Sequence, residues 1–461
     1  ASGGTTTGLY PHVLDSLYMA GLFIALPYLA LAGKGRRVVE HWKRRSRDLP
    51  SRSGKKPCIW VHGVSVGEIL SARRFLGKFH QEFSDWDVVL STTTQSGLEA
   101  GRRHYPDLQI VSYPFDFSFL VKRAFDRIRP DLVLIVEHEL WPNFLWHAHA
   151  RGVPVAIVNG RLSERSLRGY RWLSRVVTWP PPGIVTLCVE DEVTAAGFRK
   201  LGVAADRIRV TGNFKFDNSV PGYEGVREAL GWNGSQWVLV GASTHKGEED
   251  ALLDSFSRIY REDNRSRLII APRHPERARE LSGLAALRGF HPVLWSGADA
   301  NGAGGKNGQG GDGRRREAGV LDSNGHGEVI IVDTMGELDR ISSAADVVFV
   351  GGSLVPFGGH NIIAPAGTGL PVVIGPHHQN FRSVVSAFLE RDALLVARNA
   401  EDLSRKLEEL KRDPARARGL ALRASETVAL HSGASDRTLD ALRPLIQALE
   451  VRRRIGVGQC P

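Results

Sequence analysis

The chain has 461 residues, of which 42% are hydrophobic and 24% are charged, and its formal net charge is +10. This length exceeds one ordinary hydrophobic core and predicts two core domains with additional segments. Three widely spaced cysteines exclude a disulfide framework and a zinc-binding spacing, and they favour a reducing compartment. The excess of positive charge favours an anionic partner, whether a membrane surface, a phosphorylated substrate or a nucleic acid.

The first predicted element is an uncharged apolar run over residues 16–33, followed by a basic segment over residues 34–52. The run is only just long enough to cross about 30 Å of hydrocarbon and contains Pro27, so it either spans the bilayer or embeds in it. The positive-inside rule places the rest of the chain in the cytoplasm. We therefore predict a membrane anchor and basic juxtamembrane segment over residues 1–52, in contact with an anionic membrane surface. A cleaved signal peptide and a buried core helix are the alternatives.

After residue 56, short apolar runs alternate with amphipathic helical stretches, a pattern typical of parallel sheets covered by helices on both faces. In the first half the predicted strands are Cys58–His62, Val88–Ser91, Ile110–Tyr113, Leu132–Val136, Val155–Asn159 and Ile184–Val189. In the second half they are Val238–Gly241, Leu268–Ala271, Val329–Val332, Val347–Val350, Val372–Ile374 and Leu394–Val396. The sequence therefore predicts two Rossmann-like α/β domains, over residues 53–215 and 222–425, with a C-terminal helix and tail over 426–461.

Residues 297–327 interrupt the second domain with a stretch rich in glycine, asparagine and aspartate. Such a composition cannot bury enough apolar surface to order itself, so it predicts a disordered surface insertion. Its basic cluster, residues 314–316, lacks the interleaved aromatic side chains that stack on bases, and nucleic-acid binding is therefore not favoured.

Doubly wound domains bind ligands at the carboxyl ends of their strands, so we expect an active site in a cleft between the two predicted domains. The first predicted strand is followed by His62-Gly-Val-Ser-Val-Gly-Glu68, in which two glycines permit a tight turn and Glu68 begins a helix. Glu68 is a candidate for chemistry, although a helix N-terminal carboxylate favoured by the macrodipole is at least an equal interpretation. His62 alone fits a structural role better than a catalytic one.

The fourth predicted strand ends in Glu137-His138-Glu139, which gathers two carboxylates and a histidine at one sheet edge. A metal site is not favoured by this pattern, and acceptor binding or loop bracing fits better. Arg161 and Arg165 follow the fifth strand and are suited to holding an anionic acceptor, with ordinary solvated arginines as the alternative.

Glycine-rich loops follow several strands of the second half, at residues 241–245, 351–353 and 358–361, and Arg273 follows another strand. Backbone amides in such loops bind phosphate, and an arginine adds a bidentate contact. Because neither G-x-G-x-x-G nor G-x-x-x-x-G-K-[ST] occurs at these loops, a dinucleotide oxidoreductase and a P-loop NTPase are not supported. A nucleotide site is the better prediction.

Several strings of the chain together resemble the bacterial 3-deoxy-D-manno-octulosonic acid (Kdo) transferase family. In chain order they are Trp60–Glu68, Glu139–Asn143, Asn159–Ser166, Asn213–Asp217, Ala242–His245, Pro272–Pro275, Asp333–Leu338 and Gly375–His377. They extend from about Tyr10 to beyond Phe381 and are highly specific as a set.

The resemblance implies a GT-B glycosyltransferase at the inner membrane, with its catalytic domains on the cytoplasmic face. It implies CMP-Kdo as donor and a lipid A precursor as acceptor in lipopolysaccharide assembly, without a metal or other cofactor. By position, Glu68 matches the general base of the family. The acceptor side is matched by Glu139, Arg161 and Lys215. The nucleotide side is matched by Arg273, His274, Met335, Gly336, Glu337, Gly352, Ser353 and Asn361.

The expected mechanism is inverting: Glu68 removes a proton from an acceptor hydroxyl, which attacks the anomeric carbon while CMP departs from the opposite face. One departure from the family pattern stands on the nucleotide side, where Ala364 replaces a glutamate that is expected to help hold the nucleotide. Two alternatives follow from Ala364. One is a GT-B transferase that uses another sugar nucleotide, and the other is a catalytically weak nucleotide- or lipid-binding homologue.

Overall fold

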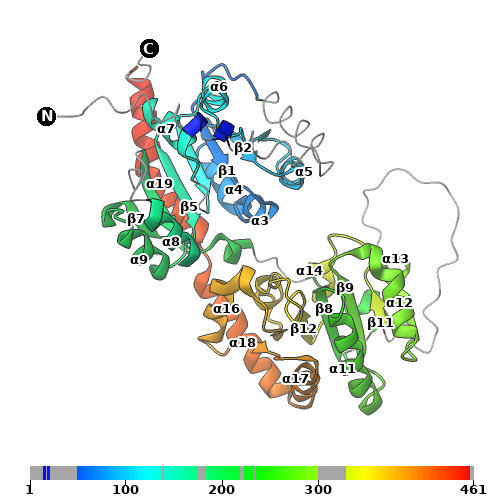
Figure 1. Cartoon of the computed structure of the whole chain (residues 1–461). Coiled ribbons are helices and arrows are strands. Elements are labelled where there is room, and N and C mark those ends of the chain that lie inside the picture. The colour runs from blue at the N-terminus through cyan, green and yellow to red at the C-terminus, as the bar shows by residue number, and fades with distance from the viewer. Residues whose placement is uncertain are drawn as a thin grey trace, which may run out of the picture. The chain divides into compact units, whose positions relative to one another are not determined.

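The computed structural model (Figure 1) describes residues 14–16, 18–20, 49–137, 140–162, 164–173, 183–218, 223–232, 234–298 and 329–456. The chain forms two compact bodies. The first body comprises Ala1–Asn218 and Ser432–Pro461, and the second comprises Ser219–His431. The C-terminal region of the chain is therefore divided between the bodies, which the sequence does not indicate.

Within its described residues, the first body contains a seven-stranded sheet in the order β3-β2-β1-β4-β5-β6-β7, and every pair of neighbours is parallel. Its elements are β1 Cys58–His62, α3 Val66–Ser71, α4 Arg73–Glu82, β2 Asp87–Thr92, α5 Gln95–His104, β3 Gln109–Ser112, α6 Ser118–Ile128, β4 Leu132–Val136, α7 Pro142–Ala150, β5 Val155–Gly160, α8 Glu164–Leu173, β6 Ile184–Val189, α9 Glu192–Lys200, η1 Ala205–Arg207, β7 Ile208–Val210, η2 Phe214–Asn218 and α19 Ala434–Arg454. The strand order reverses between β1 and β4, which is the point where doubly wound sheets bind ligands.

The second body likewise contains a parallel seven-stranded sheet among its described residues, in the order β10-β11-β9-β8-β12-β13-β14. Its elements are α10 Val226–Ala229, β8 Val238–Thr244, α11 Glu248–Glu262, β9 Arg267–Pro272, η3 Pro275–Arg277, α12 Ala278–Ala286, β10 Pro292–Leu294, α13 Trp295–Ala298, β11 Val329–Ile331, α14 Leu338–Ser342, β12 Val347–Val350, α15 Ile363–Gly367, β13 Val372–Ile374, η5 Gln379–Phe381, α16 Arg382–Leu389, β14 Leu395–Val396, α17 Ala400–Arg412 and α18 Pro414–His431. Here the order reverses between β8 and β12.

The twelve strands predicted from apolar runs are all present, with ends that differ by at most three residues. The prediction of two Rossmann-like sheets is therefore confirmed. The edge strands β7 and β10 were not predicted. In β7 only Ile208 is buried, and β10 begins with a proline and is only half-buried, so neither has the continuous apolar run of a central strand.

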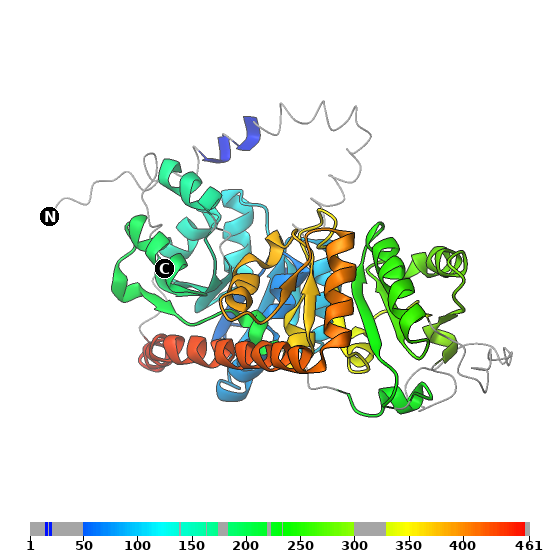
Figure 2. The same ribbon diagram turned by 90° about the horizontal axis from the view of Figure 1, so that it is seen from below.

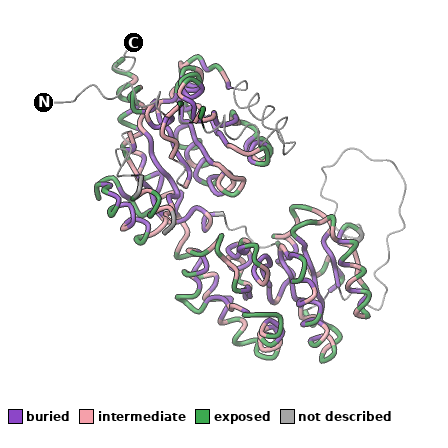
Figure 3. The backbone as a smooth tube through the Cα atoms, viewed as in Figure 1, coloured by how far each residue is buried: buried purple, intermediate pink, exposed green. Residues whose placement is uncertain are grey.

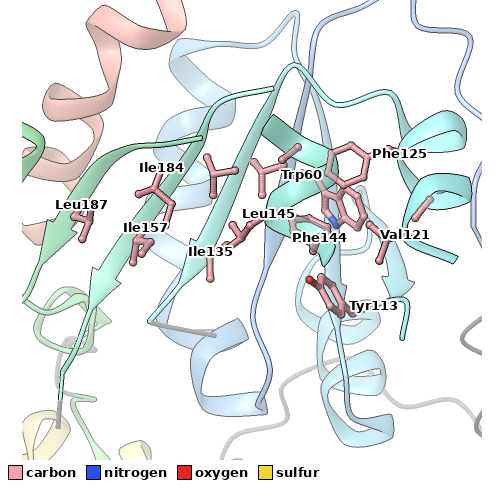
Figure 4. Packing of buried hydrophobic residues seen from close by; sticks show 14 of the residues in the cluster. Trp60, Tyr113, Val121, Phe125, Ile135, Phe144, Leu145, Ile157, Ile184 and Leu187 are labelled. Atoms are coloured by element: carbon pink, nitrogen blue, oxygen red, sulfur yellow. The ribbon is translucent and has the colours of Figure 1, made fainter. Parts of the chain in front are cut away.

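The core of each body lies between its sheet and the helices that cover it, and the central strands are buried almost throughout (Figure 3). On one face of the first sheet, Trp60 of β1 packs edge-on against Phe125 of α6 and Phe144 of α7, with ring centroids 5.3 and 4.9 Å apart (Figure 4). Such aromatic contacts add to the burial of apolar surface. This packing holds β1, one of the two strands that flank the reversal in strand order, against α6 and α7.

The opposite face of the first sheet is covered by α3, α4 and α19. Figure 2 shows α19 as one long helix, and its Leu442 and Ile446 share a buried cluster with Phe75 and Phe79 of α4. Asp217 caps the start of α19, because its carboxylate accepts the backbone N–H groups of Gly433, Ala434 and Ser435 at 2.6, 3.1 and 2.5 Å. The C-terminal helix is therefore part of the core of the first body.

Most of the predicted anchor, residues 1–52, lies outside the described residues. In the described part, Tyr18 donates a hydrogen bond to Asp116 at 3.2 Å, and Asp15 accepts the backbone N–H of Ser118 at 2.9 Å. Across the ranges that the structure describes, no helix combines the length and the apolar character needed to cross a membrane. The predicted insertion over 297–327 also lies outside them, apart from the two residues that end α13.

Candidate active site

Glu68 lies in the first turn of α3, directly after the carboxyl end of β1. Ser65 is the N-cap of α3, and its hydroxyl accepts the Glu68 N–H at 3.2 Å and donates to Glu68 Oε1 at 2.9 Å. The Val64 N–H donates to Glu68 Oε2 at 2.7 Å. Both carboxylate oxygens are thus held by short local hydrogen bonds, and the half-buried side chain keeps part of its surface accessible to a ligand. The capping interpretation and a catalytic role are compatible.

The turn before Glu68 leaves little room for a side chain at Gly63. A Cβ atom on Gly63 would lie 3.3 Å from both Glu68 Cβ and Ile69 Cδ1. His62, in contrast, is buried, its Nδ1 contacts Ser91, and its ring stacks on Tyr113 with centroids 3.7 Å apart. This environment fits the structural role expected for His62.

A partly buried charge cluster follows the ends of β4, β5 and β6. Arg161 lies 3.6 Å from a Glu137 oxygen and 3.5 Å from a Glu190 oxygen, and the side chains of both glutamates are mostly covered. Glu137 adopts a positive φ of 67°, a conformation that non-glycine residues rarely adopt and that is often found at functional sites. The structure therefore brings the predicted Arg161 together with two carboxylates, of which Glu190 had not been predicted.

Lys215 belongs to the same cluster. Asn213 donates to Glu190 at 2.7 Å and accepts the Lys215 backbone N–H at 2.9 Å, so Glu190 also positions the start of η2. Burial, and then the charge of Arg161, lowers the pKa of Lys215, while Glu137, Glu190 and Glu68 act in the opposite direction. Lys215 is thus electrostatically coupled to Glu68.

Glu139 and His138 lie outside the described residues, as does Ser163, and the side chain of Arg165 is not described either. Over the described ranges, no group of three or more histidine, cysteine, aspartate or glutamate side chains is arranged to hold a metal ion.

In the second body, the Glu248 carboxylate accepts hydrogen bonds from the backbone amides of the loop that follows β12. Its fully buried carboxylate accepts the N–H groups of Gly352, Ser353 and Leu354 at 2.7, 2.9 and 2.8 Å, and also that of His245 at 2.9 Å. The expectation that these amides bind a phosphate directly is therefore not met in this structure, because an internal carboxylate already accepts their hydrogen bonds. The assignment of Gly352 and Ser353 to the nucleotide side stays a prediction that must rest on other contacts.

Two histidine side chains are in contact near this loop. His245 follows β8, His360 follows β12, and their Nε2 atoms lie 2.9 Å apart. Phe357 stacks on His245 with ring centroids 4.0 Å apart, and Phe357 as a whole residue is 59% exposed. Gly352 has a φ of 66°, and a Cβ there would lie 2.8 Å from His360 Cδ2, so the glycine makes room for the histidine pair.

The remaining residues predicted for the nucleotide side occupy loops after the strands. Arg273 and His274 follow β9 and are exposed; His274 lies 3.4 Å from Glu276. Met335 is 69% exposed, Gly336 has a φ of 88°, and Glu337 is the N-cap residue of α14, 3.5 Å from Arg340. Asn361 accepts the Ile363 N–H at 3.0 Å just before α15, whose first turn contains the half-buried Ala364.

Comparison with known proteins identifies the family. A family model described as 3-deoxy-D-manno-octulosonic-acid transferase (kdotransferase) matches residues 40–218. The 3-deoxy-D-manno-octulosonic acid transferase of Bordetella pertussis is 31% identical over 395 residues, which cover 83% of this chain and 86% of that protein. The chain belongs to the Kdo transferase family. Another relative of this Kdo transferase, the protein of the same name from Haemophilus influenzae, is 28% identical over 84% of the chain and 87% of its own length.

Solved structures agree with the fold of the Kdo transferase. A putative UDP-N-acetylglucosamine 2-epimerase from Listeria monocytogenes aligns with a TM-score of 0.55 at 11% identity, covering 85% of this chain and 97% of that one. The UDP-GlcNAc 2-epimerase from Neisseria meningitidis aligns with a TM-score of 0.54 at 10% identity, covering 84% and 100%. At such identities the similarity speaks for the fold alone, and the predicted α/β fold of GT-B type is confirmed.

Proposed function

We propose that this Kdo transferase moves Kdo from CMP-Kdo to a lipid A precursor, with inversion at the anomeric carbon. The observation that carries the proposal is Glu68, a carboxylate held at the end of β1 in a chain of this family. Its two hydrogen-bond donors, the Val64 N–H and the Ser65 hydroxyl, fix its orientation. An ionised, oriented carboxylate is suited to accept a proton from a sugar hydroxyl.

In the proposed reaction, an acceptor hydroxyl loses its proton to Glu68, and its oxygen forms a bond to the anomeric carbon of Kdo. The bond between that carbon and the CMP phosphate oxygen breaks, and the electron pair leaves with CMP. Arg161 and Lys215, in the charge cluster near Glu68, are proposed to hold an anionic group of the acceptor. Arg273 is proposed to stabilise the departing phosphate electrostatically.

A direct test is mass spectrometry of a tetraacylated lipid A precursor that has been incubated with the full chain and a CMP-Kdo generating system. The expected product is heavier than the precursor by one or more Kdo residues. An unchanged acceptor mass, with a folded protein and a confirmed supply of CMP-Kdo, would refute the proposal.

Ala364 favours a second candidate, a transferase of the same fold that uses another sugar nucleotide. Ala364 sits in the first turn of α15 close to Asn361, where a glutamate would be able to accept a hydrogen bond from a ligand. Titrations with CMP and with UDP separate the two candidates, because the Kdo transferase reaction requires a preference for CMP.

We also propose that residues 1–52 attach the enzyme to the cytoplasmic face of the inner membrane. The support is the uncharged run over 16–33 followed by the basic segment. Deletion of residues 1–33 is expected to move the protein from the membrane to the soluble fraction, while CMP binding is retained. Unchanged membrane partition of the deletion variant would show that another surface mediates attachment.

A further inference from the structure

The contact between His245 and His360 joins loops from the two strands that flank the reversal in the second sheet. The residues are 115 positions apart in the chain, their ring planes differ by 4°, and their Nε2 atoms are 2.9 Å apart. Because β8 and β12 are neighbours on which such folds place ligands, the pair lies where a ligand of the second body is expected.

The protonation of this pair is constrained by its geometry. At 2.9 Å, one Nε2 must carry a hydrogen and the other must not. If both rings are neutral, the accepting ring has its proton on Nδ1, and the donating ring has none there. Addition of one proton to the donating ring preserves the internal hydrogen bond, creates one positive charge, and gives both rings an Nδ1–H donor.

The surroundings of the pair disfavour its protonation in the absence of a ligand. Burial, followed by the charges of His245, Arg273 and His274, lowers the pKa of His360 to about 4. The pKa of His245 is also lowered, mainly by burial and also by His274, Arg273 and Arg277, whereas Glu248 acts in the opposite direction. Glu248 is the one carboxylate among these neighbours, and four backbone N–H groups already share its charge.

The same surroundings are suited to an anion. Arg277 is paired with Glu249 and Glu280, but Arg273 has no carboxylate partner among the residues that the structure describes. Over those residues the Nδ1 atoms of His245 and His360 also have no hydrogen-bond partner. The stacked ring of Phe357 covers one face of His245 and is compatible with a charged imidazole, because aromatic faces attract cations.

We propose that His245 and His360 act as one unit that binds the phosphate of the nucleotide and takes up a single shared proton when the phosphate arrives. This proposal rests on the proposed nucleotide-dependent function. A bound phosphate raises the affinity of the pair for a proton, so proton uptake occurs at pH values between the free and the bound pKa. Phosphate binding is therefore strengthened as the pH falls through the bound-state pKa, and weakened as it rises above it.

The test is calorimetric titration of the full chain with CMP between pH 5.5 and 8, in buffers that differ in ionisation enthalpy, which yields the number of protons taken up. The wild type is compared with His360→Asn. At pH 6 the variant is expected to bind CMP roughly tenfold more weakly, a loss typical of a charge-assisted hydrogen bond. It is also expected to take up fewer protons, by a difference approaching one. The titration of free CMP is the same in both experiments and cancels in this difference.

His291→Asn is the matched control, because His291 is exposed and lies before β10, at the opposite end of the strands. It is expected to behave as the wild type. Cytidine, which lacks the phosphate, is expected to bind both proteins equally and without proton uptake. Equal CMP affinity and equal proton uptake in the wild type and His360→Asn would overturn the proposal.

If His360→Asn does not fold, as judged by its melting curve, nitrogen-15 NMR of the histidine rings in the wild type replaces it. The expected spectrum shows one Nε2–H shared by two rings, and an additional Nδ1–H after CMP is added. Ring signals that are unaffected by CMP would refute the proposal that the pair binds the phosphate. If the protein transfers Kdo but its histidine signals do not respond to CMP, the proposed function stands and the proposed role of the histidine pair is rejected. If the pair responds to CMP but no Kdo is transferred, the role of the pair stands and the proposed function is rejected.

Discussion

The two candidate regions hold their charged side chains in different ways. In the first body, Arg161 lies within 3.6 Å of Glu137 and 3.5 Å of Glu190. The charges of both carboxylates and of Glu68 act to raise the pKa of Lys215, against the larger lowering effect of burial. In the second body, Arg273 and the histidine pair have no such carboxylate partners among the described residues, and Glu248 is engaged by backbone amides. A region whose cations are already paired with carboxylates is suited to orient an acceptor, whereas a region whose cations have no such partners is suited to bind the phosphate of a nucleotide.

This comparison predicts that chemistry and nucleotide binding can be separated by mutation. Glu68→Gln is expected to lower the rate of Kdo transfer by about 10²–10⁴, because an amide cannot accept the proton. The amide still accepts the Val64 N–H and can donate to the Ser65 hydroxyl, so the melting temperature should change little. The measurement is the transfer rate together with CMP affinity, which should be unaffected. The control is Glu99→Gln on the exposed face of α5; a Glu68→Gln enzyme as fast as this control would exclude Glu68 as the base.

The second prediction concerns the internal carboxylate of the second body. Glu248→Gln leaves one acceptor oxygen for four N–H groups, and each buried, unsatisfied group costs about 1–3 kcal/mol. A decrease of roughly 6 °C or more in melting temperature is expected, together with weaker CMP binding. Glu262→Gln, at the exposed end of the same helix, is the control and should shift the melting temperature by far less. Equal melting temperatures would mean that the loop after β12 is held by other contacts.

The smallest expected effect concerns Ala364, on the side of the second body predicted to bind the nucleotide. Ala364→Glu is expected to tighten CMP binding about threefold to tenfold, because a carboxylate there can accept a hydrogen bond from a ribose hydroxyl. Ala364 is half-buried rather than enclosed, which favours this outcome over a buried, unpaired carboxylate. Calorimetry with CMP and a melting curve test it, with Ala286→Glu on the surface of α12 as the control. Weaker CMP binding combined with a lower melting temperature would count against CMP-Kdo as the donor.

The sequence predicted the strands and the loops that carry the candidate residues, because buried parallel strands are read directly from continuous apolar runs. It could not predict contacts between residues that lie far apart in the chain. His245 and His360 are 115 positions apart, and Glu248 and Gly352 are 104 apart, so no local spacing indicates that they meet. Glu190 was missed for the same reason, since its partners Arg161 and Asn213 lie on other loops. The acidic residues that follow β6 and begin α11 were the signal that could have drawn attention to Glu190 and Glu248.

The return of α19 to the first body has a consequence for the order of folding during synthesis. The second body is one continuous stretch of chain, Ser219–His431, and it can fold as soon as that stretch has emerged from the ribosome. The first body lacks Leu442 and Ile446 until residues 434–454 have been made, although its Phe75 and Phe79 emerge first. Until then, α4 exposes an aromatic surface that invites association with other chains or with chaperones. The half of the protein that is synthesised first is therefore the half that is completed last.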